Sequence, residues 1–168
     1  MFPIQIDVIF EDEYMAIVNK PPGILTNGNR FRTLENALTH NLAVSTRPDA
    51  LAWPRPVHRL DRATQGLVVI AKTQQAEIFL NRQFQERRVQ KTYRAIVGGR
   101  LEGQGVIRMP IDDRQASTKW RVEQVTRSLR TDWLSTVLLY PTTGRTHQLR
   151  RHMASLGHAI SGDVLYGT

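Results

Sequence analysis

The apolar residues of this chain come in short runs separated by proline and glycine, and this spacing limits the folds open to it. The longest runs, Leu67–Ala71 and Val137–Tyr140, have the length of a β-strand and fall far short of the ~20 residues that a membrane-spanning helix needs. Strand-like and helix-like segments alternate irregularly, without the regular β-α-β order of a doubly wound sheet. The sequence therefore predicts an α+β fold with a mixed, largely antiparallel sheet and a few flanking helices.

Turn and cap signals place the elements of the first half. Residues 8–10 and 14–18 are strand-like and flank an acidic turn, so we expect a hairpin. Thr33 and Thr73 each precede a helical apolar pattern, and a threonine there caps a helix by accepting an amide hydrogen bond. The second helix is expected to carry an apolar stripe: Ala76, Phe79, Leu80 and Phe84. The prolines at 48, 54 and 56 predict a loop between about residues 43 and 56.

Strand patterns account for most of the remaining elements. Strands are expected over Leu67–Lys72, Lys91–Val97, Val106–Ile111, Lys119–Glu123 and Asp132–Tyr140. A last helix should begin near Thr146 and stop at Gly157. Its inward residues should be Leu149, Met153 and Leu156. These patterns complete the α+β prediction.

Charge and cysteine content narrow the classes of function. The chain has 168 residues, 23 Lys plus Arg against 15 Asp plus Glu, and a net charge of +8. Because the cations are mostly arginine, which makes bidentate contacts to phosphate and stacks on bases, nucleic acid is a favoured partner. A merely basic surface is the alternative. With no cysteine, disulfides, a thiolate nucleophile and Cys-ligated metal sites are excluded.

The segment 57–66 places a carboxylate between two arginines. Asp61 lies between Arg59 and Arg62, just before an expected buried strand. Flanking cations favour the ionised carboxylate, which could then act as a nucleophile or base. A structural Asp–Arg network at a turn explains the same residues, so this segment alone leaves both interpretations open.

A second segment, residues 142–152, brings glycine, threonine and arginine to the start of a helix. Unpaired amides at a helix N-terminus bind anions. Arg150 follows the inward-facing Leu149 and could therefore reach a carboxylate in a cleft. The alternative is an ordinary helix start with a solvated basic face. His147 and His152 are five residues apart and do not share a helix face, so no metal site is predicted.

Four segments, in order along the chain, resemble the motifs of the RluA-type pseudouridine synthases. They are Asn19–Gly23, His58–Gly66, Lys91–Ala95 and Thr143–Gly167. Gln65 stands where the family usually has serine, and no S4-type RNA-binding domain precedes the motifs. We therefore expect one catalytic domain over residues 1–168. The expected domain stops where relatives usually continue with another strand. It is either a natural minimal form or a truncated one.

The resemblance implies a pseudouridine synthase-like fold with a central RNA-binding cleft, and isomerisation of uridine in ribosomal or transfer RNA without cofactor or metal. Asp61 would be the catalytic nucleophile or base, Arg150 would pair with it, and Tyr93 would pack against the uracil and take part in proton transfer. The implied RNA-binding residues are Arg59, Arg62, Arg145 and Leu149. Arg59 would fill the space of the flipped nucleotide. We expect the basic surface around the cleft to include some of Arg87, Arg88 and Arg151. For Arg87 and Arg88 the alternative is that they only complement the dipole of the preceding helix.

Two other classes of function stay open. One is an RNA-binding protein whose catalytic site has decayed, and the other is a glycoside-cleaving enzyme, which commonly needs two carboxylates. We expect an RNA stem-loop as partner, no membrane, no obligate protein partner and a monomer. A cytoplasmic location is expected because four acidic residues precede the first basic one, Lys20, the opposite of a secretory signal.

Overall fold

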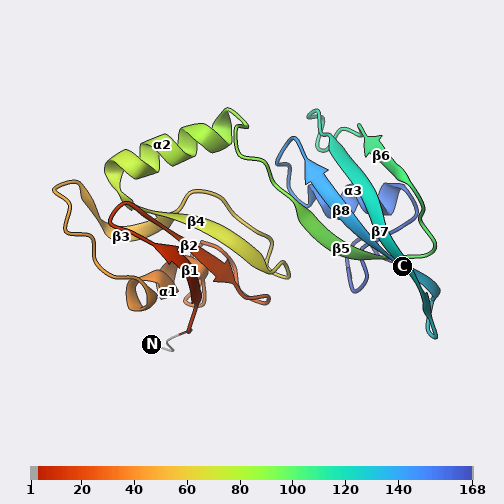
Figure 1. Cartoon of the computed structure of the whole chain (residues 1–168), viewed down its shortest axis with the longest axis horizontal. Coiled ribbons are helices and arrows are strands. Elements are labelled where there is room, and N and C mark those ends of the chain that lie inside the picture. The colour runs from red at the N-terminus through yellow and green to blue at the C-terminus, as the bar shows by residue number, and fades with distance from the viewer. Residues whose placement is uncertain (1–3, 168) are drawn as a thin grey trace. The chain divides into compact units, whose positions relative to one another are not determined.

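The computed structural model describes residues 4–167. Contacts divide the chain into two compact units, Met1–Arg88 and Val89–Thr168. Figure 1 labels the strands and helices of both units. Strands and helices are both present in each unit, so the predicted α+β class is confirmed. The strands form two four-stranded sheets, one in each unit, where the sequence predicted a single mixed sheet.

The sheet of the first unit is antiparallel throughout. Its order is β1 (Asp7–Glu11), β2 (Met15–Lys20), β4 (Gly66–Thr73) and β3 (Ala50–Pro56). The predicted hairpin is present as β1 and β2. Alternate residues of β2 are buried, since side chains of a strand point to opposite faces in turn.

The predicted loop over residues 43–56 is wrong for residues 50–56, which form strand β3. Pro54 and Pro56 lie within this strand, although proline cannot donate to a ladder. The strand tolerates them because it is at the edge of the sheet, where only β4 pairs with it. Its register also shifts between Ala50 and Arg55.

The two helices of the first unit begin where the threonines predicted. Thr33 Oγ1 accepts from the amide of Asn36 at the start of α1 (Leu34–Asn41), at 3.2 Å. Thr73 caps α2 (Gln74–Gln85) in the same way. The apolar stripe of α2 is less buried than predicted, since Phe79 is 60% exposed and no residue of the helix is fully buried.

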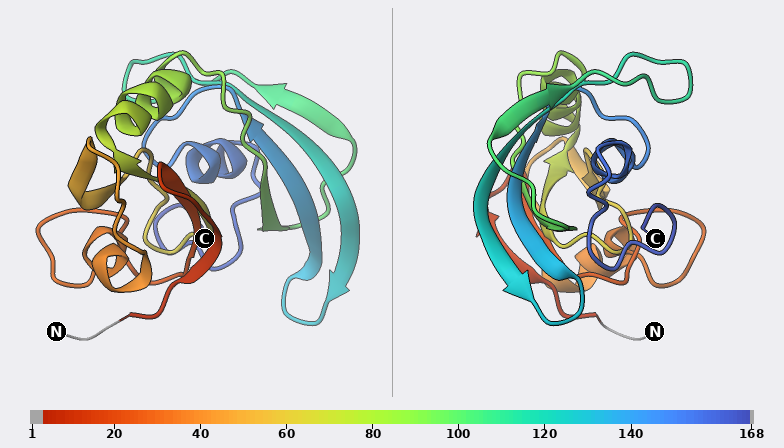
Figure 2. Two further views of the ribbon diagram at one scale, coloured as in Figure 1. Left: turned by 60° about the vertical axis from the view of Figure 1, so that its left-hand side comes forward. Right: turned by 90° about the vertical axis from the view of Figure 1, so that its right-hand side faces the viewer.

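The second unit has its own antiparallel sheet and one helix. The order is β5 (Tyr93–Gly98), β8 (Asp132–Pro141), β7 (Thr118–Ser128) and β6 (Gln104–Ile107). Helix α3 (Gln148–Ser155) lies within the curve of this sheet, as Figure 2 shows. Met153 is buried against Val97 and Val137, whereas Leu156, also predicted to face inward, is exposed.

Helix α3 begins two residues later than Thr146. His147 has φ 52°, a left-handed conformation that cannot belong to a right-handed helix. Among residues 4–167, no helix has both the length and the apolar character needed to cross a membrane.

Candidate active site

Asp61 lies on a turn between β3 and β4 in the first unit. Its carbonyl accepts from the amide of Thr64 at 3.0 Å, which closes the turn. The side chain of Asp61 is half-buried, while Arg59 and Arg62 on either side are exposed. Leu60, directly before the carboxylate, is buried. The turn thus presents two cations to solvent around a carboxylate whose neighbour is packed in the core.

Thr26 fixes the residue that precedes Asp61. Its hydroxyl accepts from the amide of Leu60 at 3.1 Å and donates to the carbonyl of Leu60 at 3.0 Å. Thr26 is itself buried. Both backbone polar groups of Leu60 are therefore satisfied by one side chain from a distant part of the sequence, and this holds the start of the turn in place.

The residue after Asp61 is held just as closely. The amide of Gly23 donates to the carbonyl of Arg62 at 2.7 Å, and Arg62 Nε donates back to the carbonyl of Gly23 at 2.9 Å. Gly23 has φ 90°, a conformation that favours glycine. The predicted RNA-binding Arg62 therefore also braces the turn that carries Asp61.

A buried lysine completes this support. Lys20 Nζ donates to the carbonyls of Pro21, Ile24 and Arg62 at 2.9, 3.0 and 3.4 Å. Burial lowers the pKa of Lys20, and the negative charge of Asp61 acts in the opposite direction. Lys20 thus places a positive charge near Asp61 and ties the loop after β2 to the turn. No role for Lys20 was predicted from the sequence.

His58, in the same motif, has a structural position. Its Nε2 accepts from the amide of Val69 at 3.0 Å. Its ring stacks on Phe84 of α2, with centroids 4.5 Å apart. These contacts join the turn to β4 and α2.

Tyr93 is the first residue of β5 in the second unit. It pairs with Leu139 of β8 and is half-buried against the hydrophobic core of this unit. It lies on the same strand face as Ala95 and the fully buried Val97. The core therefore restrains its ring.

Arg150 of α3 forms a bidentate ion pair with Asp163. Its Nε and Nη2 donate to the two carboxylate oxygens at 2.6 and 2.7 Å. The guanidinium also lies over the ring of Tyr166, 5.1 Å from its centroid. The hydrogen bonds from Arg150 hold the pKa of Asp163 well below its usual range, and the amides of Leu165 and Tyr166 add to this effect.

This ion pair gives Arg150 a fixed orientation. Two of the five N–H donors of a guanidinium suffice for Asp163, so the contact is compatible with a second carboxylate partner. Asp61 was predicted from the resemblance as the partner of Arg150, and that pairing stays a prediction. The contact between Arg150 and Asp163 was not predicted from the sequence.

The loop before α3 is organised by a buried glutamine. Gln148 Oε1 accepts from the hydroxyl of Thr143 and the amide of Arg145, at 2.7 and 3.0 Å. Gln148 Nε2 donates to the carbonyl of Ser117 and the hydroxyl of Thr118, both at 3.0 Å. These bonds anchor the start of α3, and with it Arg150, to β7.

Comparison with known proteins identifies the family to which the chain belongs. Residues 14–155 match the RNA pseudouridylate synthase family. The chain belongs to this family. It is 39% identical over 178 residues to the ribosomal large subunit pseudouridine synthase D of Nitrosomonas europaea, covering 98% of this chain and 50% of that protein. It is 38% identical over 178 residues to the dual-specificity RNA pseudouridine synthase RluA of Haemophilus influenzae, covering 96% and 77%.

A solved structure agrees with this assignment. Human RNA pseudouridylate synthase domain containing 1 superposes with a TM-score of 0.80 at 28% identity, covering 98% of this chain and 70% of that one. The predicted pseudouridine synthase-like fold is thereby confirmed. The chain spans about half the length of some curated relatives that it matches.

In this pseudouridine synthase family member, the predicted RNA-binding residues differ in exposure. Arg59 is exposed. Arg145 is half-buried and its Nε donates to the carbonyl of Gln115 at 3.2 Å. Leu149 packs against the hydrophobic core of the second unit. The structure therefore gives Arg145 and Leu149 a part in packing beside their predicted contact with RNA.

The wider set of arginines is partly engaged in ion pairs. Arg151 pairs with Asp112 at 2.8 Å and Arg88 with Glu86 at 2.8 Å. Surface pairs of this kind contribute little to stability, so these arginines can exchange a carboxylate for a phosphate at small cost.

The histidine nearest to Arg150 and Arg151 on α3 is structural. His152 is buried, with Nδ1 at 2.9 Å from the hydroxyl of Thr118 and Nε2 at 3.0 Å from the carbonyl of Met109. Burial lowers the pKa of His152. Within residues 4–167, no group of three or more His, Cys, Asp or Glu side chains is arranged to hold a metal ion.

Proposed function

We propose that this chain is an RNA pseudouridine synthase that isomerises uridine to pseudouridine in ribosomal or transfer RNA. In this reaction the bond from ribose C1′ to uracil N1 breaks and a bond from C1′ to C5 forms. C5 loses a proton and N1 gains one. The observation that carries the proposal is the family match over residues 14–155, which includes Asp61, Tyr93 and Arg150.

The braced turn supports Asp61 as the catalytic nucleophile or base. A reacting carboxylate must be held close to the productive geometry, and the neighbours of Asp61 on both sides are fixed by Thr26, Gly23 and Lys20. Lys20 adds a positive charge near Asp61.

Arg150 is proposed to pair with Asp61 and orient it, and Tyr93 to pack against the uracil and take part in proton transfer. The bidentate contact with Asp163 supports this role for Arg150, because it restricts the guanidinium to one orientation. The half-buried position of Tyr93 supports a fixed ring, which both stacking and proton transfer require.

RNA is the proposed partner, and the net charge of +8 supports it. The target uridine must leave the base stack before its glycosidic bond can be reached. Arg59, which is exposed beside Asp61, is proposed to fill the vacated space. A relative named for the ribosomal large subunit favours ribosomal RNA, with transfer RNA as the second candidate. We further propose that both units act together as one catalytic domain, in a cytoplasmic monomer.

Mapping pseudouridine in cellular RNA with and without the gene tests this proposal and identifies the target. The purified wild-type chain should then form pseudouridine in that RNA. Asp61→Asn should abolish turnover and leave RNA affinity nearly unchanged, because the substitution keeps size and removes charge and nucleophilicity. Asp7→Asn, at an exposed carboxylate in β1, is the matched control and should keep full activity.

Three outcomes of the product analysis separate the candidate functions. Pseudouridine supports the synthase, and free uracil would indicate a glycoside-cleaving enzyme. RNA binding without either product would favour the second candidate, a catalytically decayed RNA-binding protein. Turnover by Asp61→Asn at the wild-type rate would refute the proposed role of Asp61.

A further inference from the structure

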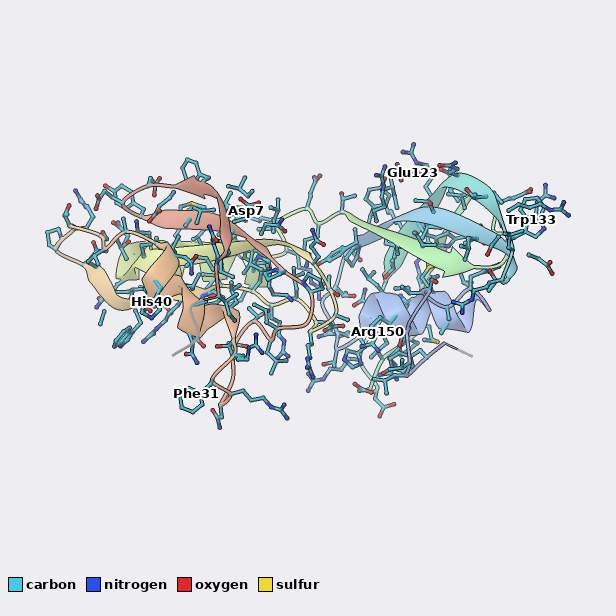
Figure 3. The ribbon with its side chains drawn as sticks, turned by 90° about the horizontal axis from the view of Figure 1, so that it is seen from below. Asp7, Phe31, His40, Glu123, Trp133 and Arg150 are labelled. Carbon is cyan, nitrogen blue, oxygen red and sulfur yellow. The ribbon has the colours of Figure 1, made fainter. Side chains whose placement is uncertain are left out.

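An exposed phenylalanine stands between two arginines in the loop that joins β2 to α1. Phe31 is 93% exposed, and Arg30 and Arg32 are exposed on either side. In Figure 3, Phe31 lies at the tip of this loop and points away from the body of the first unit. A single exposed apolar residue needs no explanation, so the inference depends on what surrounds it.

The loop is held in shape by α1 despite its exposure. Asn36 Nδ2 donates to the carbonyls of Arg30 and Phe31 at 3.1 and 3.2 Å. Gly28, with φ 129°, lets the chain turn back toward the helix. Because the backbone at the tip is fixed, little ordering entropy is lost when the side chain of Phe31 binds a partner.

The base of this loop is attached to the turn of Asp61. The amides of Leu34 and Glu35 donate to the carbonyls of Leu25 and Thr26 at 2.8 and 2.9 Å, which closes the loop. Thr26 is also the residue whose hydroxyl holds both backbone groups of Leu60. One buried threonine therefore connects the exposed loop to the residue that precedes the proposed catalytic carboxylate.

The charge around the loop favours a polyanion. Residues 23–34 contain two arginines and no acidic residue, and Arg59 and Arg62 are exposed on the connected turn. The nearest acidic residue in sequence is the half-buried Glu35. An exposed aromatic ring between cations is the arrangement with which proteins bind unpaired nucleotides, the ring stacking on a base and the cations contacting phosphates.

The same unit offers an informative contrast. Phe10 of β1 is 45% exposed, but its strand begins at Asp7 and ends at Glu11, and Asp12 and Glu13 follow. Carboxylates at this density repel a phosphate backbone. Aromatic exposure therefore coincides with positive charge at Phe31 and with negative charge at Phe10.

We propose that the loop Asn27–Arg32 binds an unpaired nucleotide next to the target uridine, with the ring of Phe31 stacked on its base. Arg30 and Arg32 contact the flanking phosphates. This inference rests on the proposed function, since it assigns part of the RNA-binding surface of the same enzyme. It adds a site that the motifs containing Asp61, Tyr93 and Arg150 do not include.

The probe is an RNA stem-loop that carries one loop uridine and 2-aminopurine at a neighbouring loop position. Binding is measured in the Asp61→Asn background, so that no turnover is needed. Stacking on Phe31 should quench the 2-aminopurine, and Phe31→Ala should remove the quench and weaken affinity by about 5- to 150-fold. Phe31→Tyr, which keeps the ring, should bind as the parent does. The matched control Phe10→Ala should also bind as the parent does.

The arginines are tested through the dependence of affinity on salt. Each phosphate contact to a single strand contributes about 0.7 to the slope of log K against log salt concentration, so Arg30→Gln with Arg32→Gln should reduce that slope by about 1.4. Arg100→Gln, at an arginine of the second unit paired with Glu102, should leave the slope unchanged.

The outcomes separate this inference from the proposed function. If Phe31→Ala binds and quenches as Phe10→Ala does while the wild type forms pseudouridine, the loop proposal is wrong and the enzyme assignment stands. If binding depends on Phe31 but the wild type forms no pseudouridine in any RNA tested, the loop proposal is supported and the catalytic function is wrong.

Discussion

Replacing Asp163 by asparagine tests how Arg150 is held. The side chain of Asp163 is 4% exposed and that of Arg150 is 20% exposed, so the pair is mostly shielded from water. Breaking a buried pair costs about 3–5 kcal/mol, whereas an exposed pair contributes about 0–1 kcal/mol. Asparagine keeps one oxygen for Arg150 and the backbone amides. We therefore expect Asp163→Asn to lower the free energy of unfolding by about 2–3 kcal/mol at pH 7.

The neighbouring ion pair on the same helix is a matched control. Arg151 pairs with Asp112, whose side chain is 69% exposed. Solvent screens this pair, so Asp112→Asn should lower the free energy of unfolding by less than about 1 kcal/mol. The comparison keeps the chemical change constant and varies only the burial of the carboxylate.

The pH dependence of this difference is a second test. The folded pKa of Asp163 is depressed by Arg150, so its stabilisation is present above the unfolded pKa of about 3.9 and is lost as the pH falls toward the folded value. Between pH 7 and pH 3 the stability difference between wild type and Asp163→Asn should shrink by about 1 kcal/mol. Groups common to both proteins cancel in this comparison.

Urea unfolding of the three proteins at pH 7 and pH 3 measures both effects. The reasoning would be refuted if Asp163→Asn and Asp112→Asn cost the same at pH 7. It would also be refuted if the cost of Asp163→Asn did not depend on pH.

Three further substitutions probe the proposed site. Lys20→Met should lower the free energy of unfolding by about 2–4 kcal/mol, because the buried ammonium donates to three carbonyls; an unchanged urea midpoint would contradict this. Tyr93→Phe should lower kcat by about 10²–10⁴-fold at unchanged RNA affinity if the hydroxyl moves a proton, whereas full activity would assign Tyr93 to core packing. Arg150→Lys should keep little activity because lysine lacks the planar, two-pronged guanidinium. If Asp61 and Arg150 pair, a double-mutant cycle of Arg150→Lys and Asp61→Asn, measured by RNA affinity, should give a coupling energy.

The sequence predicted correctly those helix starts and turns that depend only on neighbouring residues. The caps at Thr33 and Thr73 and the first hairpin depend on neighbouring residues and were predicted correctly. Strand β3 was missed because its prolines are tolerated only at a sheet edge, and edge position is a property of the assembled sheet. Phe79 was predicted in the buried stripe of α2 but is exposed. Its burial depends on how the helix packs on the sheet, which is a property of the assembled unit.

Three of the supporting residues of the site could not be assigned from the sequence for a related reason. Thr26, Gln148 and Asp163 act on residues that are distant in sequence or lie across a loop, and no periodicity reports such contacts. Lys20 is different, because it continues the alternation of buried residues that Ala16 and Val18 begin in β2. A lysine on the core face of a strand indicates that carbonyl acceptors must meet it, and that signal was present in the sequence.

There is a physical reason why so many hydrogen bonds hold the turn of Asp61. A connection between two strands is ordinarily among the more mobile parts of a fold, whereas a catalytic group loses its effect when it is misplaced by about 1 Å. Burying the ammonium of Lys20 is costly unless its donors are satisfied, and the carbonyls that satisfy it belong to the segments beside Asp61. Displacing the turn would therefore remove one of the three acceptors of a buried charge, the carbonyl of Arg62. This penalty makes the turn rigid, and through Thr26 the same rigidity extends to the loop that carries Phe31.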